Sequence, residues 1–368
     1  MIPKTEIEMA ETIREAKSPI ALHGGGSRGL SVHGDPIKTT GLNGITLYEP
    51  GSLTLVAQAG TPILDIEAAL AAEGQRLAFE PMDSRGLTGS AGASTIGGVV
   101  AANNSGPRRV SVGACRDFLL GVRFIDGMGR AISNGGRVMK NVTGYDLAKL
   151  MAGSWGTLGV MTEVSLKVLP NPEMTGVLLL NGLDDQAAVA VMSKALGSPF
   201  EVTGAAHAPV GVDGHPVTML RLEGFEESVT YRLDALRQHL ASDAEQVIET
   251  SPDRTTAGWK WVRDVELFHG RKGNVWRVSV KPSDAPALVS RIENDAVLYD
   301  WGGGLIWLLC PEDEDVRSKM HGVQGHATLV RGEGHLLFHP EPTAIVKLSQ
   351  GLRAKFDPRG LFNQGLMG

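Results

Sequence analysis

The chain has 368 residues, of which 42% are hydrophobic and 21% are charged, and its formal net charge at pH 7 is −6. This composition is typical of an ordinary soluble protein and excludes the strongly basic surface of a nucleic-acid binder. The length predicts two domains, because a single hydrophobic core rarely grows beyond about 250 to 300 residues.

The chain opens with a predicted helix over residues 6–17 and a buried strand over residues 19–23. The strand leads into Gly24-Gly-Gly-Ser-Arg-Gly29, which matches the G-x-G-x-x-G fingerprint of a nicotinamide enzyme. Such an enzyme needs a helix to begin at the last glycine and face the pyrophosphate, and Gly34 and Pro36 disfavour that helix. We therefore interpret the segment as a helix-free phosphate-binding loop, with a Rossmann site as the less favoured alternative.

A long run of small residues, Gly89 to Gly106, follows two strands predicted at 45–48 and 52–59 and a helix capped by Thr61. Because such a run has no bulky side chains, its backbone N–H groups can approach a phosphate or a flat ring. A flexible linker is the alternative interpretation. The apolar residues inside the run, and the segment Gly106-Pro-Arg-Arg109 at its end, favour an ordered, ligand-binding stretch.

Two more strands are predicted at residues 119–126 and 130–133, a short helix at 146–151, and an alternating strand at 160–168. Three glycines crowd the turn before the last strand, at Gly153, Gly156 and Gly159. A helix-to-strand turn alone needs about one glycine, so the others indicate close approach of a ligand.

The second half has fewer glycines, and its strands alternate with helices in two rounds. The first round has predicted strands at 177–180, 217–222 and 246–250 and helices at 186–196 and 228–240. The second has strands at 274–280 and 304–309 and helices at 285–292 and 313–321. This order predicts an antiparallel sheet with helices on one face, as in a ferredoxin-like domain. Five tryptophans of this half are expected to pack in a core or an interface: Trp259, Trp261, Trp276, Trp301 and Trp307.

Several segments carry a family resemblance: Gly24-Gly-Gly-Ser27, Ala93-Ser-Thr-Ile-Gly-Gly98, and the stretch from Lys140 through Gly144-Tyr-Asp-Leu147 to Glu163. They resemble the FAD domain of the vanillyl-alcohol-oxidase type flavoproteins, also called the PCMH-type FAD-binding superfamily. Four further segments are similar to the FAD-binding subunits of bacterial glycolate oxidases: Gly106-Pro-Arg-Arg109, Arg116-Asp-Phe118, Val138-Met-Lys-Asn-Val142 and Gly325-His-Ala-Thr328.

The resemblance implies an α+β fold in three parts. Residues 1–172 would form a non-Rossmann, PCMH-type FAD-binding domain, and residues 173–325 a ferredoxin-like α/β cap that meets the substrate or a partner. Residues 326–368 would return to the FAD domain near the flavin. The family's tail usually reads Asn-Pro-Gly, and Gln364 replaces that proline here.

The resemblance also implies which residues hold FAD. Two segments would hold the pyrophosphate through their backbone, namely Gly24, Gly25, Gly26 and Ser27, and Ala93, Ser94, Thr95, Gly97 and Gly98. Two further pairs would lie near the isoalloxazine and against the nucleotide end, namely Asn103 with Gly106, and Gly159 with Val160. Some relatives bond FAD covalently through a histidine inside the first glycine loop. Here His23 stands only at the strand edge, so we predict non-covalent FAD.

No catalytic base and no metal site are predicted. Relatives that oxidise D-2-hydroxy acids place two histidines and an acid on a divalent metal in the cap. The stretch from His326 to His335 has a different spacing and lacks the aspartate, so we expect surface or packing roles for both histidines. Arg331 is a candidate partner for a substrate carboxylate, because a guanidinium matches that group with two hydrogen bonds.

By resemblance, the chain is an FAD-dependent oxidoreductase subunit of a complex that converts glycolate to glyoxylate and passes electrons to an acceptor other than a nicotinamide. Two alternatives stay open: a stand-alone D-2-hydroxy-acid (D-lactate) dehydrogenase, and a non-catalytic subunit whose FAD relays electrons or is structural. The chain has no iron–sulfur cysteine pattern, so the implied partners are a second FAD subunit and an iron–sulfur subunit. The cap tryptophans and the segment Gly106–Arg109 are the expected contact points.

Two cysteines, Cys115 and Cys310, fit neither a zinc spacing nor a disulfide framework, and we interpret them as thiols of a reducing, cytoplasmic compartment. The N-terminus lacks the features of a signal peptide, and no apolar run approaches the roughly 18 residues of a membrane span. We therefore expect a cytoplasmic chain that reaches a membrane surface only through its partners.

Overall fold

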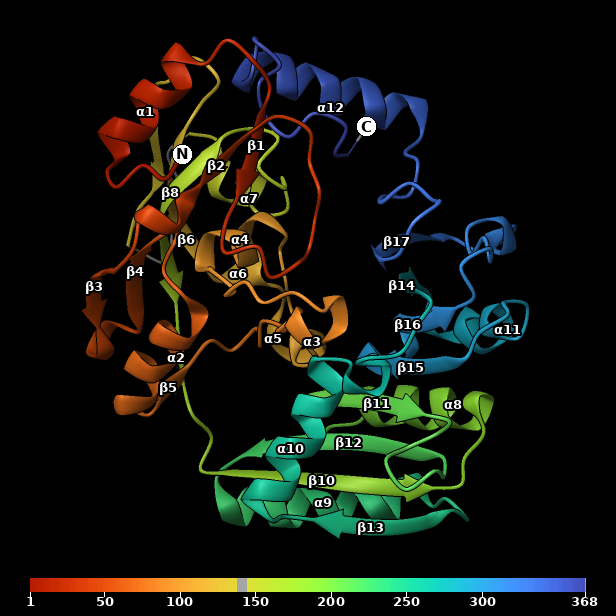
Figure 1. Ribbon diagram of the computed structural model, residues 1–368. Helices are drawn as coiled ribbons and strands as arrows, with labels where there is room; N and C mark the ends of the chain where they lie inside the picture. Colours follow the sequence, from red (N-terminus) through yellow and green to blue (C-terminus); the bar gives the residue numbers. More distant parts are fainter. Residues whose placement is uncertain (138–143, 368) are drawn as a thin grey trace.

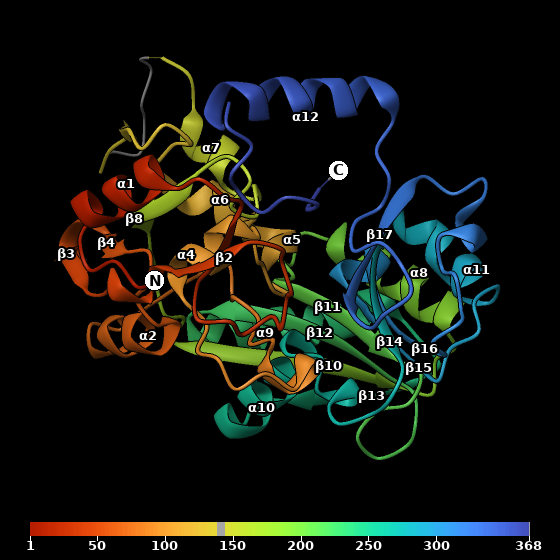
Figure 2. The same ribbon diagram turned by 45° about the horizontal axis from the view of Figure 1, so that its top comes forward.

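The computed structural model describes residues 1–137 and 144–367, so the resemblance segment Val138–Val142 lies outside the described residues. The described chain forms an N-terminal unit and a second unit that contains the large sheet (Figure 1). Helix α12 (Thr343–Phe356) crosses the top of the molecule toward the N-terminal unit (Figures 1 and 2). In the parts of the chain that the structure describes, no helix is both long and apolar enough to cross a bilayer.

The N-terminal unit is built on a five-stranded antiparallel sheet. Its strands, in spatial order, are β3 (Ile45–Glu49), β4 (Thr54–Gln58), β8 (Val160–Lys167), β6 (Leu119–Ile125) and β7 (Ala131–Gly135). Two small sheets accompany it, the parallel pair β1 (Ile20–His23) and β2 (Asp35–Lys38) and the antiparallel pair β5 (Gln75–Arg76) and β9 (Leu169–Pro170). The helices are α1 (Glu6–Glu15), α2 (Ile63–Ala72), α3 (Arg85–Thr88), α4 (Ile96–Ala101), α5 (Arg109–Val112), α6 (Cys115–Phe118) and α7 (Leu147–Met151).

The second unit is one eight-stranded antiparallel sheet, with the order β13-β10-β12-β11-β15-β16-β14-β17. Its strands are β10 (Met174–Asn181), β11 (Gly204–Ala208), β12 (Val217–Gly224), β13 (Glu245–Glu249), β14 (Asn274–Val280), β15 (Ala296–Asp300), β16 (Leu305–Cys310) and β17 (Gly325–Arg331). Its helices are α8 (Asp185–Leu196), α9 (Glu226–Leu240), α10 (Pro252–Arg263) and α11 (Ala285–Val289).

The strand order shows that the ferredoxin-like pattern occurs twice. From β10 to β13 the chain runs strand, helix, strand, strand, helix, strand, with β10 and β12 in the middle of four strands. From β14 to β17 the strand order recurs with β14 and β16 in the middle, and a 3-10 turn at Ser318–Met320 stands in place of the second helix. The two halves meet between β11 and β15, where His207 pairs with Tyr299. The predicted ferredoxin-like cap is therefore confirmed, in duplicate.

The two faces of the large sheet pack against different elements. On one face, apolar residues of α8, α9 and α11 form a single core with the strands of both halves. On the other face, Leu298, Leu305 and Trp307 pack with Met82 and Leu87 of the N-terminal unit. This second face therefore looks toward the glycine-rich segments of the first unit.

Two predicted features of the second half differ in the structure. The prediction of a helix at 313–321 was wrong, because within this range the chain forms only a 3-10 turn at Ser318–Met320. The Asp315 carboxylate accepts a hydrogen bond from the Arg317 backbone N–H at 3.1 Å, a local contact that competes with helix formation. Strand β17 extends to Arg331, so the large sheet crosses the boundary expected at residue 325.

Two local predictions in the first half also differ. Thr61 was expected to cap α2, but the helix begins after Pro62, and the Thr61 hydroxyl donates to the carbonyl of Gln58 at 2.7 Å. The run of small residues contains helix α4, which was not expected. Thr95 caps α4, because its hydroxyl accepts the N–H of Gly98 at 3.4 Å.

Candidate functional site

A cleft opens in the N-terminal unit where three loops and the C-terminal tail meet. Its lining includes most of the residues predicted to hold FAD: Gly24, Gly25, Gly26, Ser27, Ser94, Thr95, Gly97, Gly98, Gly159 and Val160. Three predicted residues, Ala93, Asn103 and Gly106, lie outside the lining. The structure thus brings together both glycine segments and the turn before β8, which are far apart in the sequence.

The glycines of the two segments have different reasons to be glycine. A Cβ added to Gly25 would lie 1.7 Å from the carbonyl oxygen of Ala93, and one added to Gly97 would lie 2.7 Å from Ala59. These two glycines are therefore required by contacts within the protein. A Cβ on Gly26 would meet nothing within 4 Å, and one on Gly98 would meet only the Thr95 hydroxyl at 3.3 Å. Gly26 and Gly98 are the positions that leave room for a bulky group.

The backbone around the cleft offers unpaired donors. In residues 1–137 and 144–367, the N–H groups of Gly25, Gly26, Ser27, Ser94 and Thr95 find no protein acceptor. Such a concave group of N–H donors fits a pyrophosphate, which carries negative charge and accepts several hydrogen bonds. By contrast, the N–H of Gly97 donates to the carbonyl of Ala59 at 2.8 Å, so Gly97 contributes shape and no free donor.

Arg28, Trp155 and Asn363 are among the lining residues that were not predicted to hold FAD. The Arg28 guanidinium lies 5.2 Å from the centre of the Trp155 ring. The Asn363 side chain accepts from the N–H of Leu22 at 2.7 Å and donates to the carbonyl of Trp155 at 2.7 Å. Asn363 therefore joins β1 to the turn before β8. The tail resemblance indicated the region of Asn363, the predicted phosphate-binding loop contained Arg28, and the resemblance stretch from Lys140 to Glu163 contained Trp155, but none of the three was singled out.

Backbone strain also gathers around this region. Several non-glycine residues here have a positive φ, which costs on the order of 1–3 kcal/mol each, namely Glu80, Asn103, Trp155, Trp301 and Asn363. Asn103 uses this conformation to accept the N–H of Arg116 at 3.0 Å. Gly106 lies against the second unit, because its carbonyl accepts the indole N–H of Trp301 at 3.1 Å.

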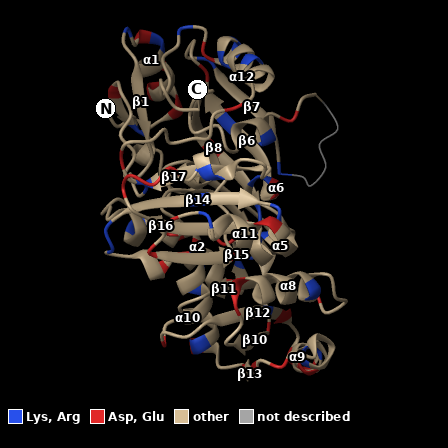
Figure 3. Ribbon diagram, turned by 90° about the vertical axis from the view of Figure 1, so that its right-hand side faces the viewer, with Lys and Arg blue, Asp and Glu red and all other residues tan. Residues whose placement is uncertain are grey.

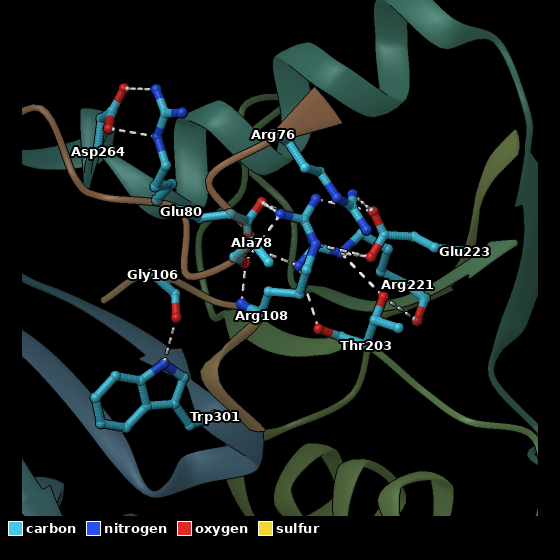
Figure 4. Close-up of polar contacts among 11 residues, drawn as sticks. Arg76, Ala78, Glu80, Gly106, Arg108, Thr203, Arg221, Glu223, Asp264 and Trp301 are labelled. Carbon is cyan, nitrogen blue, oxygen red and sulfur yellow. Dashed lines mark hydrogen bonds and ion pairs between the residues drawn. The ribbon is translucent and has the colours of Figure 1, made fainter. Parts of the chain in front are cut away.

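A buried network of charges fixes the second unit against the first (Figure 4). From the N-terminal unit, Glu80 lies 2.9 Å from Arg221, and Arg108 lies 2.8 Å from Glu223. Arg76 adds a third guanidinium, 2.7 Å from Glu223. Burial alone would raise the pKa of both carboxyls, but Arg221 and Arg108 outweigh it and hold both pKa values below the ordinary range. Both glutamates are therefore ionised at neutral pH.

A second group of arginines has no such partners. Arg109 and Arg277 place their guanidinium groups 4.7 Å and 5.0 Å from the Trp301 ring centre. Burial, followed by the charges of Arg109 and Arg28, lowers the pKa of Arg277 to about 10. Among residues 1–137 and 144–367, the side chains of Arg28, Arg109 and Arg277 make no ion pair and no hydrogen bond. Acidic groups act on two of these cations at longer range, Asp117 on Arg109 and Asp300 on Arg277. Because no carboxylate contacts the three guanidinium groups directly in the described residues, the cluster favours the binding of an anion.

Polar side chains surround Arg277 on the face that looks toward the N-terminal unit. In the register of β14 and β17, Arg277 pairs with Thr328 and Ser279 with His326. Residues two apart in a strand share a face, so these four side chains form one polar patch. His326 is an exposed residue, and partial burial of its ring, followed by the charge of Arg277, lowers its pKa. Its imidazole is therefore neutral at pH 7 and able to accept a proton.

The candidate role of Arg331 was wrong. Its guanidinium donates to the carbonyl oxygens of Leu87 and Arg271, both at 2.7 Å, and so joins the two units instead of facing a ligand. His335 packs against the Trp276 ring with 5.3 Å between ring centres. In the described ranges, no three histidine, cysteine or acidic side chains gather closely enough to hold a metal ion.

The expected contact points for partners are largely used inside the chain. Trp259, Trp276 and Trp307 are buried, and Trp301 is bonded to Gly106 as described. Arg108 is also buried, in the charge network. Trp301 and Arg108 join the two units of this chain, whereas Trp276 lies in the core between the large sheet and its helices. Trp259 packs with Val177, Ala206 and Val262 of the second unit.

Comparison with known proteins identifies the family. A family model described as an FAD binding domain matches residues 1–134. The chain is 36% identical to glycolate oxidase subunit GlcE of Escherichia coli (strain K12), over 95% of this chain and 93% of that protein. It is 32% identical to glycolate oxidase subunit GlcD of Bacillus subtilis (strain 168), over 89% of this chain and 77% of that protein.

A solved structure of alkyldihydroxyacetonephosphate synthase superposes with a TM-score of 0.69 at 16% identity, covering 99% of this chain and 76% of that one. This likeness concerns the fold alone, and together with the family model it confirms the predicted PCMH-type α+β fold and the FAD-binding domain. The chain therefore belongs to the family of FAD-linked oxidoreductases that includes the glycolate oxidase subunits GlcE and GlcD.

Proposed function

We propose that this chain is the FAD-binding subunit of a complex that oxidises glycolate to glyoxylate. The observation that carries the proposal is the set of unpaired guanidinium groups of Arg28, Arg109 and Arg277 between the cleft and the large sheet. A small 2-hydroxy acid brings the carboxylate that such a cluster lacks. The names of the two glycolate oxidase relatives support glycolate as that acid.

The residues of the chain would divide the work as follows. FAD supplies the chemistry of hydride acceptance when it is bound. Arg277 would hold the substrate carboxylate, and the hydroxyls of Ser279 and Thr328 would help to orient the acid from the same sheet face. The neutral imidazole of His326 would accept the proton of the substrate hydroxyl while the substrate carbon that bears this hydroxyl gives up a hydride. His326 thus becomes the candidate for the catalytic base that the sequence did not reveal.

FAD would be held without a covalent bond, by the unpaired N–H donors around Gly25 to Ser27 and Ser94 to Thr95. His23 is the one histidine of the cleft lining and stands at the end of β1, outside the glycine loop. Precipitating the yellow protein with acid should therefore leave the colour in the supernatant. A yellow pellet that turns colourless in the His23→Ala variant would show a covalent link through His23.

The anion site favours a subunit that binds the substrate itself over one that only relays electrons. Electrons would then pass to a second FAD subunit and to an iron–sulfur subunit, because the chain has just two cysteines and both are buried. We place this assembly in the cytoplasm. A stand-alone D-2-hydroxy-acid dehydrogenase is the alternative, and it predicts full dye reduction by the chain alone.

The test is anaerobic titration of the isolated chain with glycolate while flavin absorbance is followed. We expect bleaching, and an Arg277→Gln variant that retains FAD but binds glycolate at least about 30-fold more weakly, since losing a charged partner costs about 2 kcal/mol or more. Arg254→Gln is the matched control, because Arg254 pairs with Glu249 at the surface of the second unit. Absence of bleaching in the native chain would support the relay role and refute the proposal.

A further inference from the structure

We propose that the exposed apolar flank of α12 docks into an apolar groove bordered by carboxylates on another protein subunit. This inference rests on the proposed function, in which the chain works inside a complex. It offers a contact surface other than those expected from the sequence, because Trp259, Trp276, Trp307 and Arg108 are buried within this chain and Trp301 donates to Gly106.

One side of α12 is held by the rest of the molecule. Val346, Ser349, Arg353 and Phe356 are half-buried, and the Phe356 ring lies 6.0 Å from the ring of Phe124 in β6. The Arg353 guanidinium donates to the backbone carbonyl of Met367 at 3.0 Å. These contacts fix the direction of the helix, although none of its residues is fully buried. The helix is therefore attached to the molecule mainly through Arg353 and Phe356, and most of its length is exposed.

The neighbouring flank of α12 is apolar and uncovered. Ile345, Leu348 and Leu352 are 43%, 67% and 37% exposed. Their spacing is i, i+3 and i+7, which is the pattern of anchors by which a helix binds in a groove of another protein. Leu336, which precedes the helix in the chain, is 69% exposed as well. Scattered apolar residues need no explanation, but a stripe in register along one helix indicates a binding surface.

The charge of α12 indicates the chemistry of the groove. The helix carries Lys347, Arg353 and Lys355 and no acidic residue, whereas the whole chain has a net charge of −6 (Figure 3). Within the described residues, the ammonium groups of Lys347 and Lys355 make no ion pair or hydrogen bond. A groove bordered by carboxylates would complement both lysines and would steer the encounter of the two subunits.

Two other occupants fit this surface less well. In a symmetric dimer the same patch meets itself, so the lysines of two copies would face each other. A helix that lies on a membrane usually carries a broad apolar face of Trp, Phe or Leu opposite a polar face rich in Lys and Arg. The stripe here consists of three aliphatic residues. The one aromatic residue of α12, Phe356, packs inward on Phe124.

The experiment compares complexes co-purified from cells that express the tagged chain with the flavoprotein and iron–sulfur subunits encoded beside it. In the variant Leu348→Glu/Leu352→Glu we expect at least about tenfold less of the other subunits than with the native chain, as for the loss of interface anchors. Lys347→Glu/Lys355→Glu should show a loss in the same direction. Tyr231→Glu is the matched control, because Tyr231 is 72% exposed on α9 of the second unit, and it should leave co-purification unchanged.

Each variant is also purified alone, and its FAD content and its bleaching by glycolate are measured. Both should equal those of the native chain, which separates docking from folding. Unchanged co-purification in both α12 variants would overturn the inference. Two other results would also overturn it, provided that the Leu348→Glu/Leu352→Glu variant still forms the complex. In the first, the native chain binds vesicles of anionic phosphatidylglycerol and the variant does not. In the second, the native chain forms a dimer and the variant does not. Failure of the native chain to bleach would overturn the proposed function and leave the docking result standing.

Discussion

Replacing Glu80 with Gln should destabilise the contact between the two units more than replacing a surface glutamate with Gln. The Glu80 carboxylate accepts from both terminal nitrogens of Arg221 at 2.9 Å and from the backbone N–H of Arg108 at 2.8 Å. The Arg221 side chain is only 1% exposed, so water cannot replace the lost charge. Without Glu80, the guanidinium groups of Arg76, Arg108 and Arg221 have Glu223 as their one remaining carboxylate.

Removing one partner of a buried ion pair costs about 3–5 kcal/mol, because the remaining charge stays desolvated. The assay is urea unfolding monitored by tryptophan fluorescence. Because a chain with two units need not unfold in one step, the first unfolding transition is compared between variants. Glu249→Gln is the matched control. Glu249 pairs with the 74% exposed Arg254, and such a surface pair contributes about 0–1 kcal/mol.

The difference in stability between the native chain and the Glu80→Gln variant depends on pH because the pKa of Glu80 is lowered in the folded chain. A carboxyl with a lowered pKa stabilises the folded chain above its unfolded pKa, and that stabilisation is lost as the pH falls toward the folded value. The gap between native chain and Glu80→Gln should therefore be full at pH 7 and shrink in acid. A Glu80→Gln shift no larger than that of Glu249→Gln at pH 7 would refute the role of the network.

Two further predictions concern single positions. Gly98→Leu should abolish FAD retention, because its side chain would enter the cleft beside the Thr95 hydroxyl, which lies 3.3 Å from the new Cβ. Gly351→Leu, at an open helical position of α12, should keep FAD, and equal retention by both variants would contradict FAD binding beside Gly98. Burial raises the pKa of Asp300 to about 7, so the folded chain holds a proton that the unfolded chain releases, and stability falls as the pH rises toward 7. Asp300→Asn should flatten that decline between pH 5 and 8 in urea unfolding, and an unchanged slope would contradict it.

The elements that could be predicted from the sequence are those determined by the pattern of neighbouring residues. Alternation of apolar and polar residues located β8, and helical spacing located α1. The stretch Gly204–Ala208 was missed because its small residues have no β-forming signature, and it becomes strand β11 only through burial between β12 and β15. The 3-10 turn at Ser318–Met320 was mistaken for part of a helix, since the competing contact of Asp315 depends on a turn.

The candidate site was predicted in part for a similar reason. The two glycine segments could be found because each is continuous in the sequence and resembles a known motif. Arg28, Arg109 and Arg277 come from three distant segments, and only the placement of the large sheet against the N-terminal unit brings them together. Single arginines are common on surfaces, so their lack of partners is visible only in three dimensions.

The bond between Leu22 and Asn363 has a consequence for how the chain matures on the ribosome. These residues join β1 to the tail across 341 positions of sequence, and the carbonyl of Leu361 likewise accepts the N–H of Ile20 at 2.7 Å. Domains generally fold as units during synthesis, the N-terminal one first. Here the cleft of the first unit stays unfinished until the second unit has been translated and residue 363 has emerged. The whole of the large sheet is therefore translated before the tail can close the cleft of the first unit.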